Sequence, residues 1–233
     1  QDYWAACRAY CDALYGPWME NGNKSICLDK TPANGLILPF MAKVFPDAKY
    51  IVLTRHPLAT FSSFANSFFD GDYQTAQKYN PLLNRYVPAL AKFLRQNDTS
   101  FLHVRYEDLV SDPKVWMNTI YDYIGVPFEE GTIDYGEHAR NDSSAKGLGD
   151  PIGVAQHSRP TTDSVSKWVE ELSSDADKLT LMQTIIQQLD PADLETLGYP
   201  TDILWTPLEE AAGQTFAPKK APMSRYRLQR KAI

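Results

Sequence analysis

The sequence predicts an α/β protein in which a parallel sheet is flanked by helices. Residues 49–54 (KYIVLT) and 100–105 (SFLHVR) are short runs of β-branched and apolar side chains, as expected for strands buried inside a parallel sheet. Helical patterns lie between and after these two runs. Strands that alternate with helices of about 10–15 residues favour parallel pairing through crossover connections.

The composition is that of an ordinary folded domain. The chain has 233 residues, of which 43% are hydrophobic and 22% are charged, enough for one sizeable core. Its apolar stretches are much shorter than the roughly 20 residues that span a bilayer, so no membrane span is predicted. The net charge of −6 argues against a general nucleic-acid surface, which needs a basic field. Any anion-binding site must therefore be local.

The amino-terminal third is predicted to hold two helices and a strand before the helix that follows residues 49–54. Apolar side chains recur at three- and four-residue steps in residues 2–15, which predicts an amphipathic helix ended by Gly16 and Pro17. Residues 25–29 are a candidate strand, and 34–44 resemble a helix. A proline at the first helical position predicts a further helix over Pro57–Phe69.

The rest of the chain predicts three helices and one long loop. Residues 80–96 are helical by pattern, and 114–124 form a capped helix closed by Gly125. Residues 131–160 are rich in glycine and proline and predict a long loop, a kind of segment that often carries function. Residues 173–189 give the last clear helix.

We assign residues 1–212 to one domain and 213–233 to a basic tail or linker, because the latter carry six basic and no acidic side chains. Three cysteines without a C-x-x-C pair favour reduced thiols and a cytoplasmic location. Three Asn-x-Ser/Thr sites, at Asn23, Asn97 and Asn141, leave the Golgi lumen as the alternative.

Arg55 is the leading candidate for binding an anion. It lies between a buried strand and the helix that begins at Pro57, where open parallel sheets bind ligands. Free N–H groups at a helix start and a guanidinium fork both suit a phosphate. Ser63, eight residues on, would add a hydroxyl if it faces the same side. From the residues alone, a surface arginine and a buried helix serine remain equally open.

The same strand end argues against a magnesium-dependent site. P-loop kinases and ATPases place a carboxylate at the end of a buried strand to hold the metal. Here the strand ends in Thr54 and Arg55. A cation at this position favours an anionic ligand that is handled without metal.

These residues resemble the sulfotransferases that use 3′-phosphoadenosine 5′-phosphosulfate. In that family the 3′-phosphate motif is a buried strand, an arginine, usually a proline two residues later, and a serine at the eighth position. Arg55, Pro57 and Ser63 match it. The resemblance implies that Arg55 and Ser63 bind the 3′-phosphate of this nucleotide.

Three further segments resemble the family in the same order along the chain. Lys30 lies in a DKTP segment similar to the lysine-bearing strand end, and a family-like FPDA turn follows at 45–48. Tyr106 opens a YEDL segment whose tyrosine is expected near the adenine, although a core tyrosine is the alternative. Lys146 and Gly147 look like the late Lys-Gly loop that closes over the 3′-phosphate.

One part of the family pattern has no match. Sulfotransferases begin with a strand, a phosphate-binding loop and a helix that hold the 5′-phosphosulfate, and nothing before Ser25 fits this pattern. We therefore expect a P-loop-type sulfotransferase fold that lacks its first strand and phosphate loop. Residues 1–212 would then be a partial domain, inactive by itself.

The resemblance implies an in-line transfer of a sulfuryl group, in which positioning and charge stabilisation dominate. Lys30 is the candidate for stabilising charge on the bridging oxygen, with a solvent-exposed lysine as the alternative. His157, in the long loop, is the best available candidate for the general base. His56 is expected only to begin a helix, and Arg105 either reaches an anion or pairs with an acid.

The expected acceptor is a hydroxyl. The motif combination is similar to tyrosylprotein and polyketide- or olefin-synthase-associated sulfotransferases, and in the latter the acceptor is a β-hydroxyl on a carrier-protein-bound acyl chain. No metal, nucleic acid or membrane partner is expected. Two alternatives stay open: a P-loop-type nucleotide kinase, and a degenerate nucleotide-binding module without activity.

Overall fold

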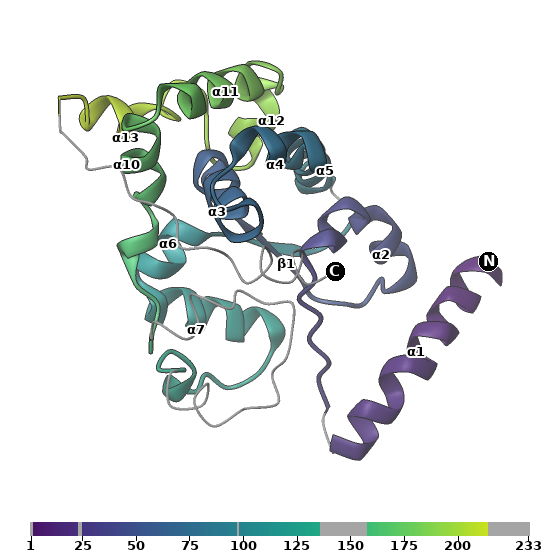
Figure 1. Ribbon diagram of the computed structural model, residues 1–233. Coiled ribbons are helices and arrows are strands. Elements are labelled where there is room, and N and C mark those ends of the chain that lie inside the picture. Colours follow the sequence, from purple (N-terminus) through teal and green to yellow (C-terminus); the bar gives the residue numbers. More distant parts are fainter. Residues whose placement is uncertain (1, 23–24, 97, 136–157, 214–233) are drawn as a thin grey trace, which may run out of the picture.

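A computed structural model describes residues 2–22, 25–96, 98–135 and 158–213. Two strands, β1 (Tyr50–Thr54) and β2 (Phe101–Arg105), form a parallel pair in which Thr54 lies opposite Arg105. Figure 1 shows these strands at the centre of the molecule with helices around them. The predicted α/β class, the predicted strands at 49–54 and 100–105 and their parallel pairing are confirmed.

The connection from β1 to β2 runs through three helices: α3 (Pro57–Phe69), α4 (Tyr73–Tyr79) and α5 (Leu82–Leu94). The prediction for α3 is confirmed, since Pro57 starts it and Asp70 ends it in a left-handed conformation with φ 55°. Helix α5 confirms most of the prediction for 80–96. The sequence reading missed α4, which Asp72 caps by accepting a hydrogen bond from the Thr75 amide at 2.9 Å.

Two helices follow β2 directly. They are α6 (Tyr106–Ser111) and α7 (Pro113–Ile124), and a short 3₁₀ turn, η2 (Glu130–Thr132), comes after them. The predicted cap and end of α7 are confirmed: Asp112 accepts from the Val115 amide at 3.2 Å, and Gly125 ends the helix at φ 81°. In Figure 1, α7 lies on the opposite side of the strands from α3.

Four carboxyl-terminal helices complete the core: α10 (Lys167–Ser173), α11 (Ala176–Gln187), α12 (Pro191–Thr196) and α13 (Thr206–Glu210). Helix α10 packs against α3, α11 against α4, α12 against α5 and α13 against α10. The predicted helix at 173–189 is α11, which begins later than expected because Asp175 caps it. The centre of the core contains fully buried side chains from these helices and α3: Leu58, Phe61, Leu172, Met182, Ile185 and Leu194. Their burial anchors α3, and with it the strand end that precedes α3.

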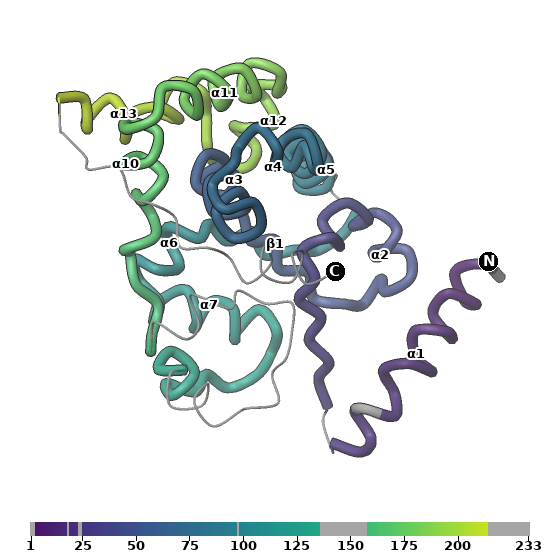
Figure 2. The backbone as a smooth tube through the Cα atoms, in the orientation of Figure 1, coloured from purple at the N-terminus to yellow at the C-terminus, as the bar shows by residue number. Residues whose placement is uncertain are grey.

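Three predictions for the amino-terminal third are wrong. Helix α1 (Asp2–Gly22) continues through Gly16 and Pro17, because a proline removes a single hydrogen bond, here to the Ala13 carbonyl, and the flanking turns stay helical. Residues 25–29 are not a strand: they form an extended stretch that pairs with no described strand (Figure 2). The predicted helix 34–44 is divided into η1 (Pro32–Leu36) and α2 (Leu38–Val44).

The predicted burial of β1 on both faces is also only partly right. Val52 and Thr54 are buried, whereas Leu53 is 53% exposed.

Helix α1 lies apart from the main body in Figure 1 and meets it through Trp4 on Phe40, at 5.6 Å between ring centres. All three cysteines are free thiols. Within the described ranges, no helix is both long and apolar enough to cross a bilayer.

Candidate functional site at the carboxyl ends of the strands

The parallel register brings two predicted site residues together. Thr54 and Arg105 are opposite each other at the ends of β1 and β2, so the residues that follow them, Arg55 and Tyr106, are neighbours. The centre of the Arg55 guanidinium lies 4.5 Å from the centre of the Tyr106 ring. This is a cation–π contact, which holds the cation in place without consuming its hydrogen-bond donors.

The Arg55 side chain has one described hydrogen bond. Its Nη2 donates to the carbonyl of Ser164, at 2.7 Å, in the short turn η3 (Thr162–Ser164). Its Nε is buried and has no partner among the described residues. A guanidinium has five N–H donors in a planar fork, so this group keeps capacity to bind an acceptor at the sheet edge.

The turn between β1 and α3 is held by Glu107 of α6. One carboxylate oxygen of Glu107 accepts from the backbone N–H of His56, at 2.9 Å, and the other accepts from the Tyr199 hydroxyl, at 2.6 Å. Burial and the Glu107 charge raise the pKa of Tyr199 above its usual value, so the hydroxyl stays protonated as the donor.

The His56 ring packs against other side chains and is not placed to bind an anion. His56 precedes the first residue of α3, as expected, and its ring stacks on Trp168 at 4.6 Å between ring centres. Its Nε2 lies 3.1 Å from the Leu204 carbonyl. Burial lowers the pKa of His56 to about 4, so the ring is neutral at neutral pH and is a poor partner for an anion.

Arg105 pairs with an acid, which was one of its two expected roles. Its Nε lies 3.9 Å from an Asp108 oxygen, and its guanidinium lies 4.9 Å from the centre of the Tyr199 ring. Gly198 allows this approach: its φ is +86°, and a Cβ added there would lie 3.1 Å from the Arg105 Cδ. Arg105 therefore holds the segment after α12 against the end of β2.

Ser63 lies on the exposed side of α3, while its neighbour Ser62 is buried. The Ser63 hydroxyl forms no hydrogen bond with the described residues. Thr60, one turn earlier, donates to the Arg55 carbonyl at 3.4 Å. Because residues three apart share a helix face, Ser63 lies on the stripe of α3 that begins beside Arg55.

No described contact connects the other predicted site residues with Arg55 or Tyr106. Lys30 is exposed in the stretch before η1, and the neighbouring Asp29 accepts from the Thr31 hydroxyl at 2.7 Å. Lys146, Gly147 and His157 lie outside the described residues. In the part of the chain that the structure describes, no cluster of three or more His, Cys, Asp or Glu side chains could hold a metal ion.

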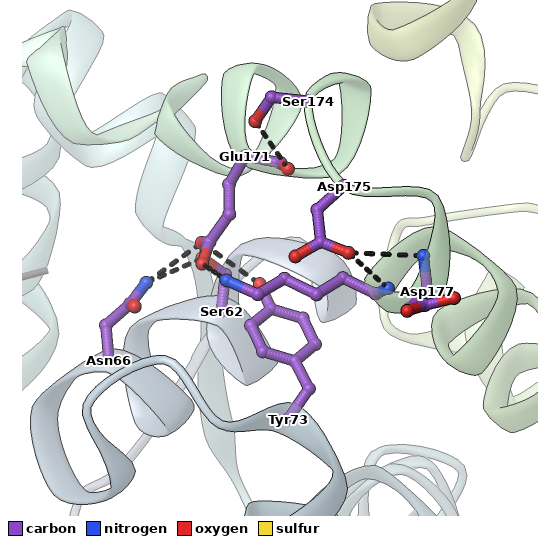
Figure 3. Close-up of polar contacts among 8 residues, drawn as sticks. Ser62, Asn66, Tyr73, Glu171, Ser174, Asp175 and Asp177 are labelled. Atoms are coloured by element: carbon purple, nitrogen blue, oxygen red, sulfur yellow. Dashed lines mark hydrogen bonds and ion pairs between the residues drawn. The ribbon is translucent and has the colours of Figure 1, made fainter. Parts of the chain in front are cut away.

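A largely buried carboxylate fixes α3 from its inner side (Figure 3). Glu171 of α10 accepts from Ser62 at 2.6 Å, from Asn66 at 2.9 Å and from Tyr73 at 3.1 Å, and it pairs with Lys178. Burial by itself raises the pKa of Glu171, but the bonds from Lys178, Ser62 and Asn66 outweigh it and hold the pKa below its usual value. This cluster sets which face of α3 points inward.

The sequence reading missed Glu107, Ser164, Tyr199 and Glu171. For Glu107 a signal was present, because an acid in the residues after a buried strand lies at the sheet edge where the site was expected. Glu171 and Ser164 are more than one hundred residues from their partners Ser62 and Arg55. No local pattern indicates such contacts.

The fold and the strand-end arrangement are those of open α/β proteins that bind ligands at the carboxyl edge of a parallel sheet. Residues 1–130 match the sequence profile described as "Sulfotransferase family". The chain therefore belongs to the sulfotransferase family, which confirms the resemblance seen in its motifs.

Two curated proteins are similar to parts of this chain. The chain is 24% identical over 159 residues to protein-tyrosine sulfotransferase 1 of Danio rerio, covering 60% of this chain and 41% of that protein. It is 30% identical over 61 residues to nodulation protein NoeE of Sinorhizobium fredii, covering 26% of this chain and 15% of that protein. The chain thus spans less than half the length of these curated relatives.

A solved structure is similar over more of the chain. The sulfotransferase domain of the Synechococcus PCC 7002 olefin synthase has a TM-score of 0.52 and 28% sequence identity, over 76% of this chain and 64% of that one. The similarity supports the observed α/β architecture.

Proposed function

We propose that the protein transfers a sulfuryl group from 3′-phosphoadenosine 5′-phosphosulfate to an acceptor hydroxyl, and that this chain binds the 3′-phosphate of the donor. The observation that carries the proposal is the position of Arg55. Its guanidinium follows β1 directly, precedes the first turn of α3 and rests on the Tyr106 ring at 4.5 Å. Family membership supports sulfuryl transfer as the chemistry.

The surroundings of Arg55 suit a phosphate. The thirteen-residue helix α3 presents free N–H groups and the positive end of its dipole at this strand end. Ser63 adds a hydroxyl on the exposed stripe of α3, two turns further along. Lys146 and Gly147 are proposed to close over the same phosphate, as in the family motif.

Sulfuryl transfer needs positioning and charge stabilisation more than covalent chemistry. The sulfuryl group carries less negative charge than a phosphoryl group, so a lysine can stabilise the leaving oxygen. We assign this role to Lys30, whose side chain is exposed. His157 is the proposed general base for the acceptor hydroxyl.

Two acceptor classes follow from the relatives. One is named a protein-tyrosine sulfotransferase, and the other is a domain of an olefin synthase. The synthase domain is similar over the larger share of this chain, 76% against 60%. We therefore favour a hydroxyl on an acyl chain, presented by a carrier protein, as the acceptor.

Calorimetric titration of the chain with three nucleotides tests the proposal. We expect 3′-phosphoadenosine 5′-phosphate to bind more tightly than adenosine 5′-phosphate, and ATP with magnesium to bind no better than adenosine 5′-phosphate. A preference for ATP that depends on magnesium would instead support the kinase alternative. Equal affinities for the first two nucleotides would contradict 3′-phosphate recognition.

A further inference from the structure

Glu107 connects three segments that meet at the carboxyl edge of the sheet. It is the second residue of α6, which follows β2. Through its two oxygens it accepts from the His56 backbone at 2.9 Å and from the Tyr199 hydroxyl at 2.6 Å. The β1–α3 turn, the β2–α6 turn and the segment after α12 are thus held by one side chain.

The bond to His56 acts on Arg55 because of peptide geometry. The N–H of His56 and the carbonyl of Arg55 belong to the same planar peptide unit. An acceptor that fixes this N–H therefore fixes the plane of the Arg55 carbonyl, to which the Thr60 hydroxyl donates at 3.4 Å. The backbone direction from which the Arg55 side chain leaves the strand is set in this way.

Tyr106 and Glu107, the first two residues after β2, hold Arg55 and His56, the first two residues after β1. The Tyr106 ring lies beneath the Arg55 guanidinium at 4.5 Å, and the Glu107 carboxylate binds the next residue, His56, through its backbone. Each Glu107 oxygen already accepts a hydrogen bond. The carboxylate is therefore placed to orient the turn rather than to take a proton from a substrate.

We propose that Glu107 is a positioning residue for Arg55, holding the Arg55–His56 peptide so that the guanidinium stays over the Tyr106 ring. The consequence for nucleotide binding rests on the proposed function, in which Arg55 binds the 3′-phosphate. The position of Arg55 itself can be measured without any nucleotide, so the two proposals can fail separately.

The test compares Glu107→Leu with Asp108→Leu, a matched change of the neighbouring acid on the same helix. Asp108 pairs with Arg105 at 3.9 Å and is 40% exposed. The first readout is the nuclear magnetic resonance signal of the Arg55 side chain, which the Tyr106 ring shifts upfield. We expect Glu107→Leu to move this signal toward its position in Tyr106→Leu, whereas Asp108→Leu leaves it in place.

The second readout is the ratio of the affinities for 3′-phosphoadenosine 5′-phosphate and adenosine 5′-phosphate. Misfolding lowers both affinities alike, whereas displacement of Arg55 lowers their ratio. We expect a fall of about tenfold in Glu107→Leu, the loss of one charge-assisted hydrogen bond. Glu107→Gln keeps a weaker acceptor for the His56 N–H, so the ratio should fall only about threefold.

The possible results distinguish the positioning role of Glu107 from the proposed function. An Arg55 signal and an affinity ratio in Glu107→Leu equal to those of Asp108→Leu would overturn the positioning role. If Glu107→Leu does not fold, Glu107→Gln tests the positioning role instead. In that variant the Arg55 signal and the affinity ratio must both change in the direction expected for Glu107→Leu, by a smaller amount, and no change in either would overturn the role. If the unmodified chain shows no 3′-phosphate preference, the proposed function fails and the Arg55 signal alone decides the role of Glu107.

Discussion

The Arg55 guanidinium lies over the Tyr106 ring, with 4.5 Å between their centres, and each residue directly follows one of the two paired strands. The contact exists because Thr54 and Arg105 are in register. It gives the tyrosine of the YEDL segment a role that differs from contact with adenine: it supports the cation that we propose binds the 3′-phosphate.

Substitution of Tyr106 distinguishes these two roles. Tyr106→Phe keeps the aromatic face and should bind nucleotides as the unmodified chain does. Tyr106→Leu removes a partly desolvated cation–π contact of about 1 kcal/mol, so binding of 3′-phosphoadenosine 5′-phosphate should weaken about fivefold. Unchanged binding of adenosine 5′-phosphate would support the role under Arg55, and an equal loss for both nucleotides would support contact with adenine.

The adjacent serines of α3 should behave oppositely. Ser62 donates to the largely buried Glu171 at 2.6 Å, whereas Ser63 is exposed. Ser62→Ala should lower the free energy of unfolding by about 1–2 kcal/mol without changing the nucleotide affinity ratio. Ser63→Ala should leave stability within about 0.5 kcal/mol and lower affinity for the nucleotide that carries the 3′-phosphate. Urea denaturation and calorimetry on both variants check this, and an exchange of the two effects would refute the assignment.

The pair of Glu171 and Lys178 should be much more important for stability than an exposed pair. The two side chains are 19% and 21% exposed, so Lys178→Met leaves a largely buried carboxylate without its cation. We expect a loss of about 2–3 kcal/mol in unfolding free energy. The control is Lys114→Met, which breaks the exposed pair with Glu130, 65% and 72% exposed, and should leave the free energy of unfolding almost unchanged because water screens an exposed pair. Equal losses in the two variants would contradict the account of the cluster.

His56 should make stability depend on pH in the acid range. Burial lowers its pKa in the folded chain to about 4, from 6.5. Between these values the unfolded chain binds a proton that the folded chain does not. The free energy of unfolding should therefore fall as pH drops from 6.5 toward 4, by up to about 1.4 kcal/mol per pH unit.

The variant His56→Gln isolates this effect. Glutamine can donate to the Leu204 carbonyl but does not titrate, so the variant should lose less stability than the unmodified chain between pH 7 and pH 5. The carboxylates titrate alike in both proteins and cancel in the difference. Identical pH profiles from urea denaturation would show that His56 is not held neutral.

The strands and α3 could be predicted because their signals are local. An apolar β-branched run followed by Pro57 specifies a strand, a turn and a helix start within nine residues. Where tertiary context decides, the prediction was wrong: α1 continues through Pro17, and residues 25–29 have no strand beside them in the described chain. Helix α4 depends on a single cap at Asp72, which the pattern of apolar residues does not reveal.

The candidate site could be predicted as separate residues but not as an arrangement. Motifs identify Arg55 and Tyr106 one by one, yet their contact depends on the register of two strands whose paired residues are 51 positions apart. Glu107 lies in the YEDL segment, but its two partners, His56 and Tyr199, are distant in sequence, so the motif does not indicate its role. The contacts of Ser164 and Tyr199 arise from the packing of the carboxyl-terminal helices, which no pattern near β1 encodes.

The most direct test of the central claim is the affinity ratio between 3′-phosphoadenosine 5′-phosphate and adenosine 5′-phosphate after substitution of Arg55. The control is Arg85→Ala, which removes an exposed arginine of α5 that donates to Asn80. Loss of a charge-assisted contact worth roughly 1.5–3 kcal/mol should lower the ratio in Arg55→Ala by about 10- to 150-fold, while Arg85→Ala leaves it unchanged. A ratio in Arg55→Ala that equals that of the unmodified chain would contradict the assignment of Arg55 to the 3′-phosphate.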